Sequence, residues 1–329
     1  MAKKVSRRNY RRKHRRWTKK RVKLAAEILA IVALFAAAVF ALQSTGELEA
    51  VLGLPEKTPA PTPAPGQAEL DVYFLDVGQA DCTLIRIPEE DGGVYTVLVD
   101  AGDQGDETAL LKKLAALGVR RIDAAVFTHP HADHIGGAAE VLQAIPCTDI
   151  YMPPVPAEKI PTTASYEDLL DTMLQQELPY MEAAAGTVIY KTENAALTVL
   201  SPQRGDAWDD LNSWSVVLRL EYGETVFLFT GDAEADCERK MLQSGQNVNC
   251  DVLKVGHHGS DSSSGTAFLS ACSPQHAVIS CGKNNDYGHP SESVLQTLAW
   301  MGIEVHRTDT EGTLHARSDG TTVTLAPAA

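Results

Sequence analysis

The stretch THPHADHIGG, Thr128–Gly137, places three of the chain's ten histidines and one aspartate within six residues. His129 and His131 are two positions apart, so their side chains point the same way in an extended segment. Asp133 and His134 follow, and a turn there would let them face a second metal position. Imidazole and carboxylate groups bind Zn²⁺, and also Mn²⁺ or Fe²⁺. The stretch therefore predicts a site for one or two metal ions, rather than a His-rich surface loop.

The sequence around this motif alternates between strand-like and helix-like segments. The apolar run IDAAVFTH leads into the motif, and the Gly136-Gly137 pair, where backbones can approach closely, opens the helical segment HIGGAAEVLQAI. DETALLKKLAALG and YEDLLDTMLQQ are further amphipathic helices, separated by β-rich stretches. The order of strands followed by helices occurs twice. It predicts an α/β (α+β) chain with two sheets flanked by helices, not a doubly wound parallel sheet.

Other polar side chains also follow predicted strands: Asp100 in VLVDAG, Asp232 in FLFTGD, and His257 and His258 in LKVGHHGS. Loops held by a rigid scaffold commonly carry function, and strand ends at one rim converge. Asp232 is expected to bridge two metals, although the position also suits a helix N-cap. One of His257 and His258 is expected to bind metal, and the other to contact substrate or pack. Asp100 either orients a ligand histidine or forms a turn.

Further residues are expected to surround the metals. Asp76, Gln79 and Asp81 in LDVGQAD are expected to shape the rim without binding metal, with Asp76 in the second layer of residues. Ser260 lies in HHGSDSSSG, whose hydroxyl and N–H groups are expected to hold an anionic oxygen of the substrate. His289 in YGHPS either donates to a substrate phosphate or is an ordinary loop histidine.

Taken together, the His-x-His-x-Asp-His motif, Asp232 and the GHHGS histidines resemble the metallo-β-lactamase superfamily. The resemblance extends from about Glu69 to Leu325. The segments FLDVGQADCTLI, THPHADHIGG, SVVLRL, FLFTGD, LKVGHHGS and YGHPS jointly resemble the hydrolase domain of ComEC-type competence (DNA-uptake) proteins and their stand-alone secreted relatives. The resemblance implies a four-layer αββα sandwich with a metal centre at its rim.

The sequence departs from the superfamily pattern at one ligand. A histidine between the motif and the bridging aspartate usually completes the first metal site, but none occurs between Ile135 and Asp251. LNSWSVV stands in this region, and the ComEC-like group shares its Asn-x-x-Ser pattern, so Asn212 or Ser215 is expected to face the site and contact substrate. Amide and hydroxyl groups are weaker ligands. The alternatives to two Zn²⁺ ions are therefore a single metal or Mn²⁺.

The expected ligands imply hydrolysis. A metal lowers the pKa of a bound water molecule and so supplies a nucleophile, which Asp133 or Asp232 would orient and deprotonate. The ComEC-type resemblance implies a phosphodiesterase or nuclease acting on DNA or a cell-envelope polymer. The alternatives are hydrolysis of a carboxylic substrate (lactam, lactone or thioester) and a binding module without activity.

Charge is unevenly distributed along the chain. Residues 1–23 hold 13 of the 29 Lys and Arg residues and no acidic residue, so the remainder carries a net charge of about −27. This acidic part disfavours broad binding to nucleic acid, although a metal still attracts a phosphate locally. The six cysteines form no CxxC pair, which argues against a zinc knuckle. They are buried thiols, or Cys272 pairs with Cys281.

The N-terminal residues predict a membrane anchor. Residues 24–42 contain one charge, Glu27, and are long enough to span a bilayer. The basic residues 1–23 are expected to stay in the cytoplasm. The Pro-rich residues 43–68 form a spacer, and residues 69–329 form a hydrolase domain outside the cell membrane. The alternatives are a cleaved signal peptide, which would make the protein secreted, and binding of RNA or DNA by the basic run.

Overall fold

The computed structural model describes residues 69–328. The predicted basic tail, membrane span and spacer lie outside the described residues. Within the described part of the chain, no helix is long and apolar enough to cross a membrane.

The first sheet has eight strands. Its N-terminal strands form an antiparallel meander that continues as a parallel sheet, and the C-terminal hairpin returns to pair with the first strand. In spatial order the strands are β15 (Val323–Pro327), β14 (Leu314–Ser318), β1 (Leu70–Phe74), β2 (Thr83–Pro88), β3 (Val94–Val99), β4 (Ile122–Val126), β5 (Cys147–Met152) and β6 (Tyr180–Glu182).

The second sheet has seven strands and also changes from antiparallel to parallel pairing. The parallel part runs from β10 to β13 and the antiparallel part from β7 to β10. In spatial order the strands are β13 (Glu304–Arg307), β12 (His276–Ile279), β11 (Val252–Lys254), β10 (Thr225–Phe229), β9 (Val217–Tyr222), β8 (Ala195–Ser201) and β7 (Val188–Lys191).

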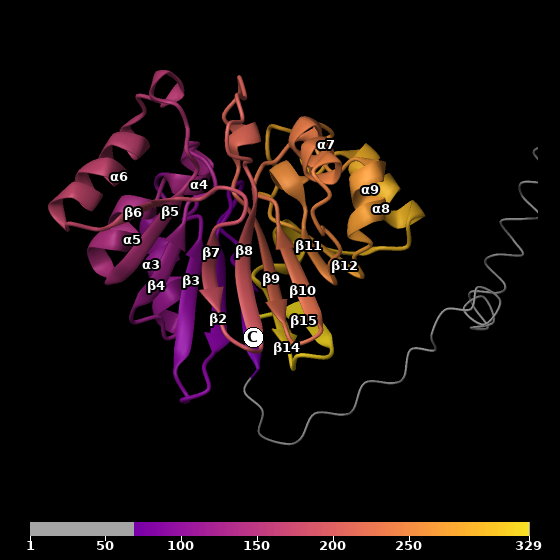
Figure 1. Cartoon of the computed structure of the whole chain (residues 1–329), viewed down its shortest axis with the longest axis horizontal. Coiled ribbons are helices and arrows are strands. Elements are labelled where there is room, and N and C mark those ends of the chain that lie inside the picture. The colour runs from indigo at the N-terminus through magenta and orange to yellow at the C-terminus, as the bar shows by residue number, and fades with distance from the viewer. Residues whose placement is uncertain (1–68, 329) are drawn as a thin grey trace, which may run out of the picture. The chain divides into compact units, whose positions relative to one another are not determined.

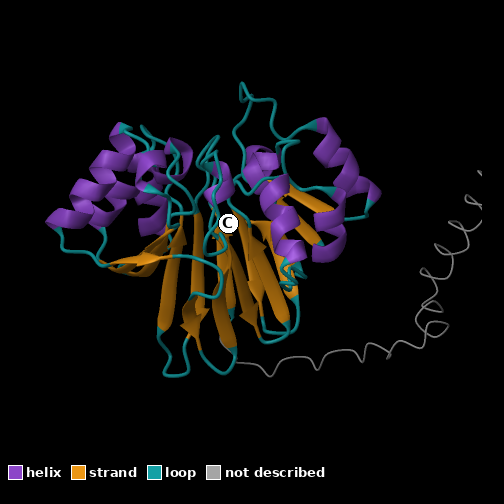
Figure 2. Cartoon of the chain, turned by 45° about the horizontal axis from the view of Figure 1, so that its top comes forward, coloured by secondary structure: helices purple, strands orange, loops and turns teal. Residues whose placement is uncertain are grey.

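Helices cover the outer face of each sheet, and the two sheets pack face to face between them (Figure 1; Figure 2). The first sheet carries α3 (Glu107–Ala116), α4 (Ala132–Ile135), α5 (Ala138–Ala144) and α6 (Ala164–Gln175), and the second carries α7 (Ala235–Gln243), α8 (Thr266–Cys272) and α9 (Glu292–Trp300). The short α10 (Thr308–Glu311) follows β13, and single 3₁₀ turns are η1 (Ala157–Lys159), η2 (Asn212–Trp214) and η3 (Gly256–Gly259). The predicted αββα sandwich is confirmed.

Three apolar clusters account for this layering. The central cluster lies between the sheets, where Phe74 of β1 and Phe229 of β10 bring their ring centroids within 6.1 Å. Strand β1 shows why, because its buried residues alternate with half-buried ones, so that one face is apolar. The other two clusters lie between each sheet and its own helices. All six cysteines lie in the described residues as free thiols, so of the two alternatives the structure shows free thiols and not the Cys272–Cys281 pair.

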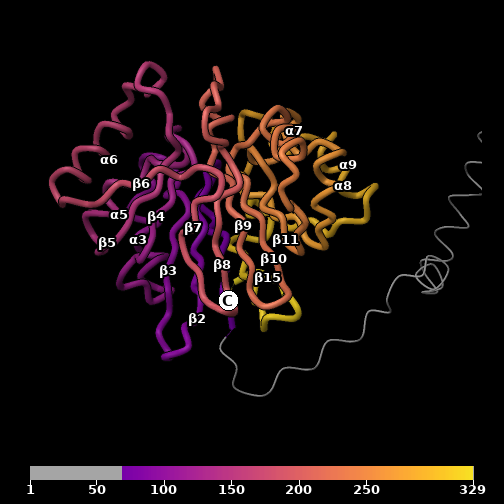
Figure 3. The backbone as a smooth tube through the Cα atoms, viewed as in Figure 1, coloured from indigo at the N-terminus to yellow at the C-terminus, as the bar shows by residue number. Residues whose placement is uncertain are grey.

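The ends of several strands meet at one rim of the sandwich. Asp100 directly follows β3, and His129, Asp232 and His257 lie three positions after the last residues of β4, β10 and β11. Figure 3 shows how the halves of the domain, coloured indigo to magenta and orange to yellow, lie side by side. Because parallel strands end at the same edge, this topology brings together polar residues that are more than a hundred positions apart.

The Gly136-Gly137 pair allows close packing beneath the first histidine cluster, as predicted. A Cβ atom on Gly136 would lie 2.2 Å from the backbone nitrogen of Gln104, and one on Gly137 would lie 2.6 Å from the carbonyl oxygen of Ala101. Backbone atoms cannot yield as a flexible side chain would. Any larger residue here would therefore displace the loop that carries the histidines.

A buried carboxylate holds the loop that follows the second histidine cluster. Glu238 on α7 is 4% exposed, and its two oxygens accept hydrogen bonds from the backbone N–H groups of Ser264 at 2.5 Å and Gly265 at 3.0 Å. Burial raises the pKa of Glu238 to about 7, although both hydrogen bonds act in the opposite direction.

We predict that Glu238 makes the protein less stable as the pH rises. Because its folded-state pKa is raised from 4.5 to about 7, its stabilising contribution is complete below pH 4.5 and is lost as the pH rises through 7. The loss amounts to up to about 3 kcal/mol. Urea unfolding of the full chain between pH 4.5 and 7.5 should show this slope in the wild type and not in Glu238→Gln. The exposed Glu140→Gln is the control, and equal slopes in wild type and Glu238→Gln would contradict the prediction.

Candidate metal centre

Four imidazole rings surround the carboxylate of Asp232. Its side chain is 2% exposed, and the Nε2 atoms of four histidines lie within 3.9 Å of its oxygens. Oδ1 is 3.3 Å from His134 and 3.9 Å from His258, whereas Oδ2 is 3.8 Å from His129 and 3.7 Å from His257. One carboxylate oxygen thus faces each pair of imidazoles. This is the arrangement expected of a residue shared by two metal positions, and Asp232 is not the N-cap of α7, which is Glu234.

In the first histidine cluster, the Nδ1 atoms of His134 and His129 are held by the protein. His134 Nδ1 donates to Asp100 Oδ2 at 2.7 Å, which is the orienting contact expected of Asp100. His129 Nδ1 lies 3.3 Å from the Ser215 hydroxyl oxygen, which also accepts the backbone N–H of Asp232 at 3.0 Å. Ser215 therefore positions two residues of the centre instead of facing it as a ligand.

The second histidine cluster is held in the same way. His257 Nδ1 lies 3.0 Å from Ser262 Oγ and 3.3 Å from Glu234 Oε1. His258 Nδ1 donates to the carbonyl oxygen of Ser280 at 3.0 Å. A metal-ligating histidine typically uses one ring nitrogen for the metal and donates the other to a carboxylate or carbonyl group. All four rings are therefore oriented with Nε2 towards the centre.

The two halves of the centre differ in their remaining members. Near His134 and His258, Asp133 Oδ2 lies 3.3 Å from His258 Nε2. These three residues and Asp232 each offer one ligand atom within 4.8 Å of the others. Near His129, the Nδ1 atom of His131 lies 2.9 Å from His129 Nε2.

Asn212 belongs to the second of these halves. Its Nδ2 atom lies 3.4 Å from His257 Nε2, and its Oδ1 atom is buried without a hydrogen-bond partner. Asn212 thus faces the site as predicted. His257 also lies in this half of the centre. It is the half for which the sequence has no histidine between Ile135 and Asp251 to serve as the usual third ligand.

The backbone separates the two adjacent histidines. His257 and His258 have φ values of 49° and 52°, in the left-handed region that residues other than glycine rarely occupy. Each such residue costs about 1–3 kcal/mol, which the surrounding packing must offset. The conformation directs His257 to one oxygen of Asp232 and His258 to the other. Both histidines of GHHGS therefore reach the centre, whereas the sequence assigned metal binding to one and substrate contact or packing to the other.

Unpartnered polar atoms show that this cluster fits a cation. His134 Nε2 and Asp232 Oδ1 are buried and lie 3.3 Å apart, but their orientation does not satisfy a hydrogen bond. Burial disfavours the charged imidazole of His258, yet the Asp232 and Asp81 carboxylates outweigh it and raise its pKa to about 10. Burial also opposes ionisation of Asp133, but the hydrogen bond from His258 lowers its pKa to about 2. The site is thus built to balance buried negative charge with positive charge, as a metal ion would.

A buried ion pair beside the centre was not predicted from the sequence. Lys254 Nζ lies 2.5 Å from Asp81 Oδ2, and Asp81 Oδ1 lies 3.5 Å from His258 Nδ1. Burial alone would raise the pKa of Asp81, but Lys254 lowers it. The signal in the sequence was a lysine inside the apolar strand CDVLKV, where a charged residue needs a buried partner. Asp81 therefore supports His258.

Asp76 and His289 were also expected close to the metal centre, and the structure places them differently. Asp76 accepts the backbone N–H of Gly78 at 3.3 Å, so it shapes a turn, and the supporting role expected of it belongs to Asp81. The His289 ring centroid lies 5.5 Å from that of His257, which places His289 beside the centre, and its Nδ1 atom is buried without a hydrogen-bond partner.

Ser260 lies in the loop between the second histidine cluster and α8. Its hydroxyl contacts Ser262 Oγ at 3.0 Å, and its N–H donates to the carbonyl oxygen of His257 at 2.8 Å. The N–H groups of Ser264 and Gly265 bind Glu238. These backbone groups already have partners within the protein, and the contact of Ser260 with a substrate oxygen stays a prediction.

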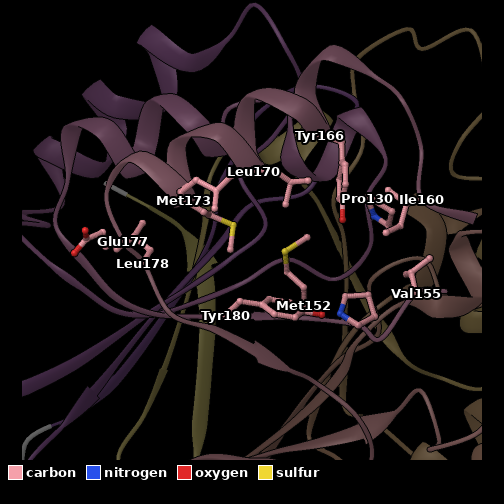
Figure 4. A pocket seen from close by; sticks show the side chains of 12 residues that line it. Pro130, Met152, Val155, Ile160, Tyr166, Leu170, Met173, Glu177, Leu178 and Tyr180 are labelled. Carbon is pink, nitrogen blue, oxygen red and sulfur yellow. The ribbon is translucent and has the colours of Figure 1, made fainter. Parts of the chain in front are cut away.

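An apolar cavity of about 680 Å³ opens beside the centre. Pro130, between the first two histidines of the motif, forms part of its wall, and α6 forms another part (Figure 4). Glu177 is the only charged side chain among the residues that line it, which are Pro130, Met152, Pro153, Val155, Ile160, Tyr166, Leu170, Met173, Leu174, Glu177, Leu178 and Tyr180.

Parts of several longer proteins are similar in sequence to this chain. The chain is 33% identical over 266 residues to "ComE operon protein 3" of Bacillus subtilis (strain 168), covering 76% of this chain and 33% of that protein. It is 32% identical over 248 residues to "Competence protein ComA" of Neisseria gonorrhoeae, covering 75% of this chain and 32% of that protein. The chain therefore spans about a third of the length of these relatives.

A solved structure and a family model complete the comparison. The structure of Igni18, a metallo hydrolase from Ignicoccus hospitalis KIN4/I, has a TM-score of 0.46 at 13% identity and covers 74% of this chain and 98% of its own. The family model described as "Metallo-beta-lactamase superfamily" matches residues 75–283. The resemblance inferred from the motifs is confirmed: this chain belongs to the metallo-β-lactamase superfamily and has competence proteins among its relatives.

Proposed function

We propose that this protein is a metal-dependent hydrolase of phosphodiesters. The observation that carries the proposal is the division of four Nε2 atoms between the two oxygens of Asp232. Residues that would hold one divalent metal are Asp133, His134, His258 and Asp232, and those that would hold another are His129, His131, His257 and Asp232. Zn²⁺ suits imidazole and carboxylate ligands, and Mn²⁺ is the alternative.

A divalent metal bound here would polarise a substrate oxygen and lower the pKa of a water molecule. The protein's own part is to orient that water and to accept its proton. The Asp133 side chain is 33% exposed and that of Asp232 is 2% exposed. Asp133 is therefore the carboxylate that a water molecule reaches, and we assign it the proton, while Asp232 holds the two halves in register. We assign His289, whose ring lies beside that of His257, the hydrogen bond to a substrate oxygen.

The preference for a phosphodiester rests on the relatives, whose names refer to competence and, for "Recombination protein 2" of Haemophilus influenzae, to recombination. A DNA strand or a polymer of the cell envelope is the natural substrate that we infer. Hydrolysis of a lactam, lactone or thioester is the second candidate. The proposed location is the outer side of the cell membrane, with residues 24–42 as a single anchor.

Replacing Asp232 tests the proposal directly. Asp232→Asn keeps the shape of the side chain and removes its charge. We expect hydrolysis of bis(p-nitrophenyl) phosphate to fall by more than about 100-fold, because residues that merely orient ligands already account for about 10–100-fold. Asp206→Asn, a buried aspartate that pairs with Lys240, should retain activity. Equal rates in wild type and Asp232→Asn would refute the assignment. Turnover of nitrocefin alone would favour the second candidate, and turnover of neither by the wild type would favour a binding module.

Two histidines should separate metal binding from substrate binding. His257→Ala should lose about one equivalent of metal per chain, because its Nε2 atom faces Asp232 Oδ2. His289→Ala should retain its metal and show a KM raised by about 10-fold, as expected for loss of one hydrogen bond to a charged group. Metal analysis after dialysis and steady-state kinetics measure the two effects. Unchanged metal content in His257→Ala would show that His257 is not a ligand.

The apolar cavity should select among substrates. Leu174 lines it and is 76% exposed, so Leu174→Glu places a charge in the cavity with little effect on folding. We expect kcat/KM for bis(p-nitrophenyl) phosphate to fall by about 10-fold, and that for methyl p-nitrophenyl phosphate, which lacks the second ring, to change little. Trp300→Glu, at a 79% exposed position on α9, is the control. Equal losses for both substrates would show that the cavity does not receive the ester group.

A further inference from the structure

A second cluster of histidines lies on the second sheet, away from the metal centre. His276 is the first residue of β12 and Glu304 the first residue of β13, and the two are direct partners in the parallel pairing. His306 is two positions after Glu304, so both side chains point to the same face of β13. The metal centre follows the C-terminal ends of the parallel strands, whereas His276 and Glu304 begin theirs. β12 has four residues, so its two ends lie roughly 10 Å apart.

The polar atoms of this cluster converge on one point. His276 Nδ1 lies 3.2 Å from Glu304 Oε2, and His306 Nε2 lies 3.5 Å from Glu304 Oε1. Each of the three residues offers a ligand atom within 4.8 Å of the others. Ligand atoms at about 2.0–2.1 Å from a tetrahedral Zn²⁺ lie roughly 3.3–3.4 Å from one another. The two observed separations from Glu304 are close to this value, each to a different oxygen of Glu304, and one ligand atom of each residue lies within 4.8 Å of the others.

Two of these atoms lack any other partner. His276 Nδ1 and His306 Nε2 are buried, and neither makes a hydrogen bond, because the nearby carboxylate does not lie in the required direction. His306 as a whole is 8% exposed. A buried ring nitrogen without a partner costs free energy unless a cation or a proton binds it. The cluster therefore contains two imidazole nitrogens that are aimed at a shared position and are otherwise unsatisfied.

The far side of His306 is held as in a metal site. Its Nδ1 atom lies 3.3 Å from Glu311 Oε2, and Glu311 Oε1 accepts the backbone N–H of Arg307 at 2.8 Å. This carboxylate–histidine contact is the orienting interaction found behind metal-ligating histidines, and in this protein Asp100 provides it for His134. Glu304, with 63% of its side chain exposed, leaves the position open to solvent.

We propose that His276, Glu304 and His306 form a further divalent-metal site, selective for Zn²⁺ or a similar transition metal, with a solvent molecule completing the coordination. Two imidazoles and one carboxylate are the ligands that such ions prefer, and they do not suit Mg²⁺ or Ca²⁺. The ion would join the edge strand β13 to β12. The site is independent of the hydrolytic centre and of the function proposed for it.

Metal analysis of the full chain tests this site. After loading with Zn²⁺ and dialysis, Glu304→Gln and His306→Ala should each contain about one equivalent less zinc than the wild type. His315→Ala is the matched control, because His315 lies on the first sheet and its Nε2 atom is bonded to Asp71. The control should retain the wild-type zinc content.

The outcomes separate this site from the hydrolytic centre. Hydrolysis of bis(p-nitrophenyl) phosphate should be unchanged in Glu304→Gln, whose loss of zinc then reports this site alone. If His306→Ala does not fold, Glu304→Gln decides, because its side chain is largely exposed. Equal zinc content in wild type, Glu304→Gln and His315→Ala would overturn the proposal, whether or not the phosphodiesterase assignment holds.

Discussion

The metal centre depends on the burial of one negative charge. Asp232 is removed from water at the end of β10, and a buried carboxylate is stable only when positive or hydrogen-bonding groups surround it. Four Nε2 atoms provide that environment. Their rings are in turn held by groups behind them, from Asp100 to the carbonyl oxygen of Ser280. Removing either the histidines or the groups behind them would leave buried polar atoms without partners.

The packing of the two sheets brings these histidines and the groups behind them together. Each sheet has one apolar face for its partner and another for its helices, so neither can be stable in isolation in water. Once they pack, the strand ends that carry the two histidine clusters share a rim. The strained backbone of His257 and His258 is then retained because cooperative packing offsets its cost. The same rigidity leaves the apolar cavity open beside Pro130.

The two histidine clusters of the second sheet share one arrangement of side chains, although they lie at opposite ends of its parallel strands. At the rim, and again at the start of β12 and β13, a carboxylate stands between imidazole nitrogens. The opposite ring nitrogens of His257, His258 and His306 contact other groups of the protein. Parallel strands favour this, because residues at matching positions in register are brought to equal height. A chain rich in Asp and Glu supplies the carboxylates, and cations are the natural complement.

Much of this architecture could be predicted from local sequence. The period of apolar residues identified strands and helices, their order indicated two covered sheets, and the spacing of His129, His131, Asp133 and His134 identified the first cluster. These features are encoded by neighbours in the chain, since they depend on backbone periodicity and on a few adjacent side chains.

Only the tertiary structure decided how distant residues pair. The division of His257 and His258 between the oxygens of Asp232 follows from left-handed backbone angles that no pattern announces. The Lys254–Asp81 pair depends on contacts across the fold, and so did the choice of Asp81 over Asp76 as a supporting residue. The sequence by itself determined which chemical groups are available and the local elements that carry them. Their partners were decided by packing, because the free energy of a buried charge depends on what surrounds it in space.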